Sequence, residues 1–161
     1  MYARRLIRLA TAASGVVGLL TVLSAPASAA ETKPFTAQKS CYVPVVSVAP
    51  PAPGGYCLIT GSSLKILKNA KAYYTAATVV QGVLSSPVTI RTNHDDGSTA
   101  IGQCIYHLQT PTTPGYGLCV YSSGTGELAG IHLTYAVGPP IGGQRVYALT
   151  GSFWFEENED D

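Results

Sequence analysis

The sequence predicts an all-β domain behind an N-terminal export signal. The chain has 161 residues, of which 17 are glycine and 11 are proline, while 46% are hydrophobic and only 12% are charged. This composition excludes a disordered chain, which needs low hydrophobicity and high charge, and a helical bundle, which needs few glycines and prolines. From residue 41 onward, short stretches of period-two alternation are separated by glycine- and proline-rich turns. That pattern is typical of an antiparallel barrel or sandwich.

Residues 1–30 have the three parts of a secretory signal peptide. Arginines among the first eight residues precede an uncharged run from 9 to 23, and Ala27-Ser28-Ala29 supplies a small-residue cleavage site. The uncharged run has about 15 residues, fewer than the roughly 20 that a membrane-spanning helix needs. We therefore expect residues 1–30 to be removed, and the mature protein to be secreted, extracellular and free of membrane contact.

The four cysteines predict two disulfides. An even number of cysteines in a secreted chain indicates pairing, and four cysteines allow three pairings. The midpoint between Cys41 and Cys57 falls in a Pro/Gly-rich turn, and the midpoint between the other two cysteines falls in a second such turn. Facing positions of a hairpin hold their Cβ atoms about 4.5–5.5 Å apart, which is close to disulfide reach. We expect the local pairs, Cys41–Cys57 and Cys104–Cys119.

Eight strands are expected within residues 41–155, which form the β domain. The expected strands are 41–48, 55–60, 72–81, 83–92, 99–109, 116–122, 127–137 and 144–155. Pro87 cannot donate to a ladder, so it indicates a bulge or an edge in its strand. Residues 31–40 are expected to be a linker, and residues 156–161 a solvated acidic tail.

Two segments depart from simple alternation. Residues 62–71 carry lysines at every third position, which indicates a solvated face on a short helical turn or a strand entry. The last expected strand, 144–155, is apolar on both faces. Because such strands are covered on both sides, we expect a core on one face and a lid or a neighbouring subunit on the other. The pattern is thus compatible with a homo-oligomer.

The C-terminal part resembles the end of the allene oxide cyclase-like barrels, which include plant cyclases, dirigent proteins and small actinobacterial proteins. The resemblance rests on Gly124-Thr125-Gly126, on Gly130 and on the closing aromatic strand Tyr147–Phe155. Residues 99–104 also resemble a cyclase strand, with Cys104 at the position of that strand's cysteine. Over roughly residues 99–155, the resemblance implies a small antiparallel eight-stranded barrel. It makes the three glycines, Gly124, Gly126 and Gly130, structural residues.

The resemblance carries no catalytic residue onto this chain. The plant cyclases rely on an internal carboxylate, whereas this chain has only Asp95, Asp96 and Glu127 between residues 32 and 155, all at expected turns. A Gly-x-Ser-x-Gly elbow, a phosphate loop and a dinucleotide fingerprint are absent from the sequence. No Cys-x-x-Cys motif or histidine spacing indicates a metal ligand set. We expect no metal and no cofactor, and the catalytic residues, if any, are unknown.

The expected barrel lumen is apolar, lined by tyrosines and nearly free of charge. Between Cys41 and Phe155 there are eight charged residues, and apart from Glu127, at the turn that opens strand 127–137, only Arg91 and Arg145 lie within expected strands. Burying an unpaired charge is costly, so these two arginines should face outward or lie at a rim. The candidate pocket residues are Tyr106, Tyr135, Tyr147, Ile131, Leu133 and Phe153.

Two functions from different classes fit these expectations. The favoured one is a non-catalytic barrel that binds a small apolar or aromatic ligand, or a partner protein. The alternative is a dirigent-like or cyclase-like enzyme that guides cyclisation or coupling of a natural product by pocket shape, which needs few ionisable groups. Nucleic acid is not expected as a partner, because a formal net charge of +1 lacks a basic footprint.

Overall fold

The computed structural model describes residues 30–42, 56–94 and 97–156. The expected signal peptide up to residue 29, the expected strand residues 43–48 and the tail residues 157–161 lie outside these ranges. Within them, no helix combines the length and the apolar character needed to cross a membrane.

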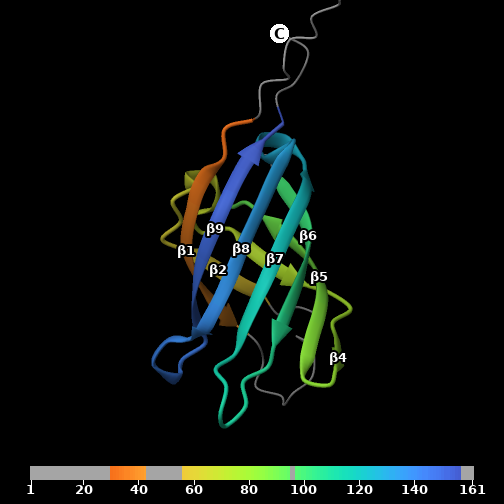
Figure 1. Cartoon of the computed structure of the whole chain (residues 1–161). Coiled ribbons are helices and arrows are strands. Elements are labelled where there is room, and N and C mark those ends of the chain that lie inside the picture. The colour runs from red at the N-terminus through yellow and green to blue at the C-terminus, as the bar shows by residue number, and fades with distance from the viewer. Residues whose placement is uncertain (1–29, 43–55, 95–96, 157–161) are drawn as a thin grey trace, which may run out of the picture.

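The described residues form one antiparallel sheet that closes into an eight-stranded barrel. The strands are β1 (Lys33–Tyr42), β2 (Tyr56–Thr60), β3 (Lys71–Tyr74), β4 (Thr78–Val80), β5 (Val83–Arg91), β6 (Thr99–His107), β7 (Tyr116–Gly124), β8 (Ile131–Pro140) and β9 (Val146–Phe155). Their order is β3-β2-β1-β9-β8-β7-β6-β5-β4, and a pairing between β3 and β5 closes the ring. The short β4 lies outside that ring, paired with β5 (Figure 1). The all-β barrel predicted from the sequence is confirmed.

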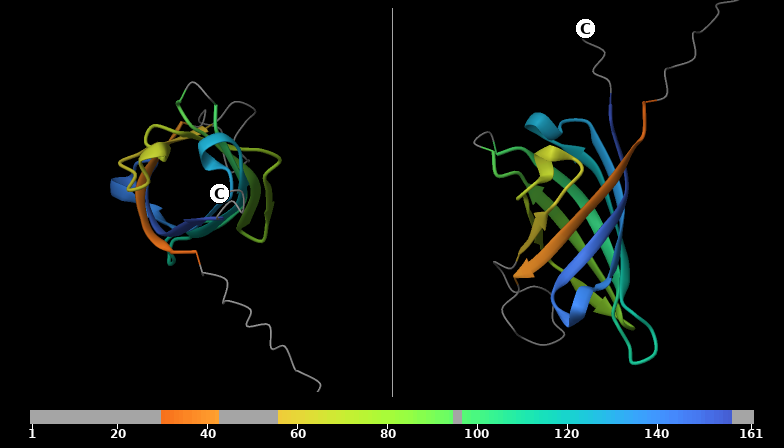
Figure 2. Two further views of the ribbon diagram at one scale, coloured as in Figure 1. Left: turned by 90° about the horizontal axis from the view of Figure 1, so that it is seen from above. Right: turned by 90° about the vertical axis from the view of Figure 1, so that its left-hand side faces the viewer.

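The barrel has two different ends. Short 3-10 helices η1 (Lys65–Leu67) and η2 (Gly126–Leu128) join strands at one end, which also holds the start of β1 and the finish of β9. We call this the capped end; Figure 2 shows both short helices there. At the opposite end, which we call the tyrosine end, β1 finishes and β2 starts, β6 turns into β7, and the 3-10 helix η3 (Ile141–Gly143) joins β8 to β9.

The first strand differs from its expected position. The sequence reasoning placed a linker over 31–40, but β1 occupies Lys33–Tyr42 and pairs with both β2 and β9. Phe35, Ala37 and Lys39 are buried and alternate with exposed residues. A charged lysine at an inward position interrupted the apolar alternation, which is why the strand was assigned as a linker.

Other boundaries moved for local reasons. The expected strand 72–81 is divided into β3 and β4, with Ala76 at a φ of 46° between them. Pro87 lies where β5 exchanges β4 for β3 as its partner, and its carbonyl accepts a hydrogen bond from the Thr75 N–H at 3.1 Å. The bulge or edge expected at this proline is therefore the point at which β5 changes its partner strand. Residues 126–128 form η2, so β8 begins at Ile131.

Both expected disulfides are present. Cys41 faces Cys57 across β1 and β2, and Cys104 faces Cys119 across β6 and β7. Each pair is joined through its sulfur atoms. Both bonds therefore connect neighbouring strands of the ring close to the tyrosine end.

The three glycines expected to be structural have steric reasons to be glycine. Gly126 and Gly130 have φ angles of 57° and 67°, a region that side chains rarely adopt. A Cβ atom on Gly124 would overlap the Leu128 carbonyl oxygen.

The outer face of β6 and β7 is partly apolar. Its exposed side chains include Ile101, Ile105, Leu118 and Val120. The homo-oligomer expected from the sequence stays a prediction.

Candidate ligand site in the barrel lumen

The inward side chains differ between the two ends of the barrel. Toward the capped end, the lumen is filled by apolar residues with at most 1% exposure, namely Leu67, Val88, Ile90, Leu128, Ile131 and Leu133. Toward the tyrosine end and the middle of the barrel, the inward positions hold Lys39, Tyr74, Tyr106, Tyr121, Tyr135 and Tyr147. We call these six residues the lumen cluster.

Glycines make room for the large rings of the lumen cluster. Gly102 pairs with Tyr121 across β6 and β7, and a Cβ on this glycine would lie 2.8 Å from atoms of the tyrosine ring. Gly117 pairs with Tyr106, and a Cβ there would lie 2.6 Å from that ring. Each ring thus covers a glycine on the neighbouring strand, an arrangement that places a large side chain against a close backbone.

Tyr121 and Tyr135 form the most deeply buried part of the cluster. Each is 1% exposed, their hydroxyl oxygens are 2.8 Å apart, and their ring centroids are separated by 5.7 Å. Burial raises the pKa of both hydroxyls well above the usual value of a tyrosine. The pair therefore remains neutral at physiological pH, and its two hydroxyls share one hydrogen bond inside the barrel.

Tyr74 connects the buried pair to Lys39. Burial is the largest cause of the raised pKa of Tyr135, and the nearby Tyr74 raises it further through charge repulsion and a hydrogen bond. The Lys39 Nζ donates a hydrogen bond to the Tyr74 hydroxyl at 2.8 Å. The same Nζ lies 5.2 Å from the centroid of the Tyr74 ring and 5.7 Å from that of Tyr147. These distances are within the range of cation–π attraction.

Tyr106 and Tyr147 form the outer part of the cluster. Both are half-buried, and their rings meet edge to face at a centroid distance of 6.2 Å. Partial burial raises the pKa of each hydroxyl, and nearby Arg145 opposes the rise at Tyr147. The cluster therefore holds three half-buried tyrosines, Tyr74, Tyr106 and Tyr147, beside the buried Tyr121–Tyr135 pair.

The six candidate pocket residues predicted from the sequence divide between two regions. Tyr106, Tyr135 and Tyr147 belong to the lumen cluster. The other three are buried in the core, with Leu133 paired to Phe153 and Ile131 paired to Phe155 across β8 and β9. The sequence predicted the inward face of these strands correctly but did not separate the core from the cluster.

The expectation of a nearly charge-free lumen is wrong because of Lys39, which is only 6% exposed. Lys39 precedes the predicted β domain of residues 41–155 and belongs to the segment 31–40 that was expected to be a linker. The sequence did contain an indication that Lys39 faces inward. Phe35, Ala37 and Cys41 are apolar, alternate along the chain and lie on the same face of β1 as Lys39. Tyr74 and Tyr121 also lie in the lumen cluster, although neither is among the pocket residues predicted from the sequence. Arg91 and Arg145 are exposed, as predicted.

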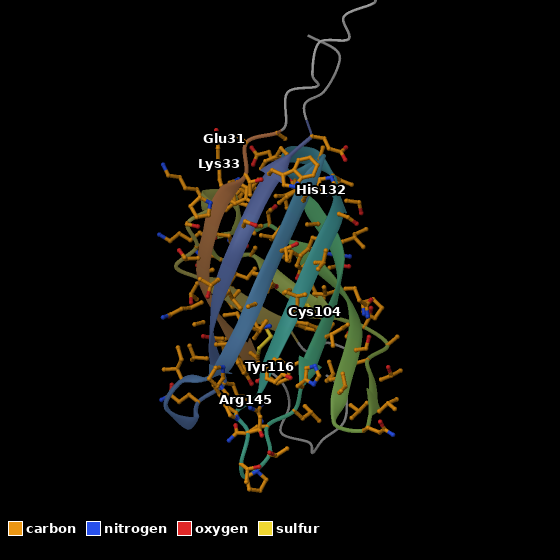
Figure 3. All side chains as sticks on the ribbon, viewed as in Figure 1. Glu31, Lys33, Cys104, Tyr116, His132 and Arg145 are labelled. Carbon is orange, nitrogen blue, oxygen red and sulfur yellow. A yellow bond between two sulfur atoms is a disulfide. The ribbon has the colours of Figure 1, made fainter. Side chains whose placement is uncertain are left out.

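Carboxylates of the described residues lie at the capped end. Glu127 is in η2 and pairs with His94 at 3.8 Å, and Glu156 follows β9 and lies 2.7 Å from the His132 Nε2. Figure 3 places Glu31 and His132 at this end, whereas Tyr116 and Arg145 lie toward the other. His132 stacks on Trp154 with their centroids 3.8 Å apart. In the ranges that the structure covers, no group of three His, Cys, Asp or Glu residues could hold a metal.

The chemistry of the lumen cluster is that of one amine and five phenols. Such groups can donate hydrogen bonds, attract an anion and stack on flat molecules. Comparisons of the chain with models of known protein families, with curated proteins and with solved structures found no match.

Proposed function

We propose that this protein binds a small ligand with a flat, apolar body at the tyrosine end of its lumen. The observation that carries the proposal is the convergence of five tyrosines from five strands on one lumen region, three of them half-buried and two fully buried. Tyrosine rings offer apolar faces, and their hydroxyls can fix the orientation of a polar group.

The proposed role is binding, and we assign no chemical step to it. The two disulfides support export to an oxidising compartment, in agreement with the signal peptide expected from the sequence. We propose that the protein acts outside the cell, where its disulfide-linked barrel carries or sequesters the ligand.

A thermal-shift screen of flat apolar compounds tests this function. A compound at 100 times its dissociation constant should add about 2.7 kcal/mol to the free energy of unfolding. Tyr147→Ala should weaken binding at least fivefold, because it removes a ring at the outer part of the cluster. Tyr116→Ala is the matched control, since Tyr116 is exposed and lies in the outward set of β7.

Two results would contradict the proposal. One is a screen in which no flat apolar compound raises the melting temperature. The other is a ligand whose affinity falls with Tyr116→Ala and not with Tyr147→Ala, because that ligand would bind on the outer face of the barrel.

A further inference from the structure

Lys39 is a buried amine whose charge is not matched by a carboxylate in the described structure. It is inward-facing on β1, with Ile59 and Tyr147 as its cross-strand neighbours. An ammonium has three donor hydrogens, and the hydrogen bond from Lys39 Nζ goes to the hydroxyl of Tyr74. The ion pairs among the described residues involve Lys33, His94 and His132, and none involves Lys39.

Such a position is expensive for a charged group. Burial removes the hydration of the ammonium, and one hydrogen bond donated to a phenol oxygen, together with two ring faces, replaces that hydration only in part. Tyr147 does not supply a negative charge at physiological pH, because partial burial raises the pKa of its hydroxyl. A lysine retained at this cost is a functional candidate.

Among the described residues, none around the tyrosine end offers the missing charge. The described connections between strands toward this end are 75–77, 81–82, 108–115 and 141–145, and they contain no aspartate or glutamate. One of them carries Arg145, which adds positive charge close to Tyr147. The described carboxylates, Glu31, Glu127 and Glu156, are associated with the capped end.

We propose that the ligand supplies this charge: it is a flat apolar monoanion whose carboxylate pairs with Lys39. The inference rests on the proposed function and names its ligand class. The carboxylate would accept hydrogen bonds from the Lys39 ammonium and the Tyr74 hydroxyl, and charge-assisted bonds of this kind are stronger than neutral ones. The apolar body would lie against the rings of Tyr106 and Tyr147.

The experiment compares two probes of nearly the same shape, 2-naphthoic acid and 2-naphthamide, by calorimetric titration of the disulfide-bonded protein. The acid is expected to bind at least tenfold more tightly than the amide. Lys39→Met should remove this preference, leaving the affinity for the amide within about threefold of wild type. Lys65→Met, at an exposed lysine of the capped end, should leave the preference unchanged. Decanoic acid, with the same head group on an alkyl chain, should bind more weakly than 2-naphthoic acid.

The outcomes separate this inference from the proposed function. Equal affinities of acid and amide for the wild-type protein would overturn the role of Lys39 and leave the binding function standing. A preference that survives in Lys39→Met would overturn it as well. Failure of both probes, together with failure of the broader screen of neutral flat compounds, would contradict the binding function itself. If Lys39→Met does not fold, the salt dependence of binding to the wild-type protein is the test. Added salt must lower the affinity for the acid and leave the affinity for the amide unchanged.

Discussion

The two ends of this barrel use the same strands for different purposes. At the capped end, η1 and η2 place Leu67 and Leu128 over a fully buried apolar core. At the tyrosine end, the inward positions of the same ladders carry hydroxyls and an amine, and the outer side chains are half-buried. The capped end is thus closed by apolar packing, whereas the tyrosine end holds the polar groups that we propose for the ligand.

The largest expected effect is the loss of an apolar side chain from the capped end. Leu128→Ala should lower the free energy of unfolding by about 3 kcal/mol, because the side chain is fully buried and its removal leaves a cavity. Leu118→Ala, the same change at a half-exposed leucine of β7, should cost less than about 1 kcal/mol. Urea unfolding of both variants measures the difference, and equal losses would remove the distinction between core and surface on which the comparison depends.

The next effect concerns the glycines that admit the large rings of the cluster. Gly102→Ala should cost about 2 kcal/mol, because its Cβ would overlap the Val120 carbonyl oxygen and approach the Tyr121 ring too closely. Gly138→Ala is the matched control, since a Cβ there would meet its nearest atom at an ordinary 3.6 Å. If chemical denaturation shows Gly102→Ala to be as stable as Gly138→Ala, the close packing of Tyr121 on β6 is not tight enough to orient the ring.

The sequence predicted the parts of this structure that obey simple periodicity. Alternation gave the inward faces of β6 and β8, and the position of the turns gave both disulfides. These predictions succeeded because apolar side chains and small turn residues mark the inside and the ends of a strand independently of its neighbours.

The candidate site was harder to predict, because its residues break the same rules. Lys39 is a charged residue at an inward position, so its strand did not show the expected apolar alternation. In β3, Tyr73 and Tyr74 are adjacent, and only the register of the ladder decides which one faces inward, since a shift by one residue exchanges the faces. Tyr73 faces outward and packs against Tyr56, with Arg91 above its ring. Register comes from pairing over the whole ring, which the local sequence does not contain.

A smaller effect, of opposite sign, is expected at Lys39 in the absence of ligand. Lys39→Met replaces a buried amine by an apolar side chain of similar length, and it should raise the free energy of unfolding by about 1 kcal/mol. Lys65→Met, at an exposed position, should change stability by less than about 0.5 kcal/mol. Thermal melts of the ligand-free proteins test this, and a clear loss of stability in Lys39→Met would mean that the amine supports the fold of the tyrosine end.

The smallest change in stability at neutral pH is expected at the buried pair, Tyr121 and Tyr135. The contribution of this pair becomes visible at alkaline pH. The pKa of both Tyr121 and Tyr135 is raised in the folded state, chiefly by burial, so the folded protein holds these protons to higher pH than the unfolded chain does. Stability is therefore fully present below the unfolded tyrosine pKa of about 10 and is lost as the pH rises above it.

The double variant Tyr121→Phe/Tyr135→Phe isolates this contribution. Because it removes both partners of the shared hydrogen bond, and because the Tyr74 hydroxyl keeps its hydrogen bond from Lys39, it should differ from wild type by less than about 1 kcal/mol at pH 7. Above pH 10, the wild-type protein should lose up to about 1.4 kcal/mol per pH unit for each of the two tyrosines, a loss that the variant avoids. Urea unfolding at pH 7, 9, 10 and 11 gives the two curves. Parallel curves would show that the pair is ionised as readily in the barrel as in the unfolded chain. That result would contradict the burial of Tyr121 and Tyr135.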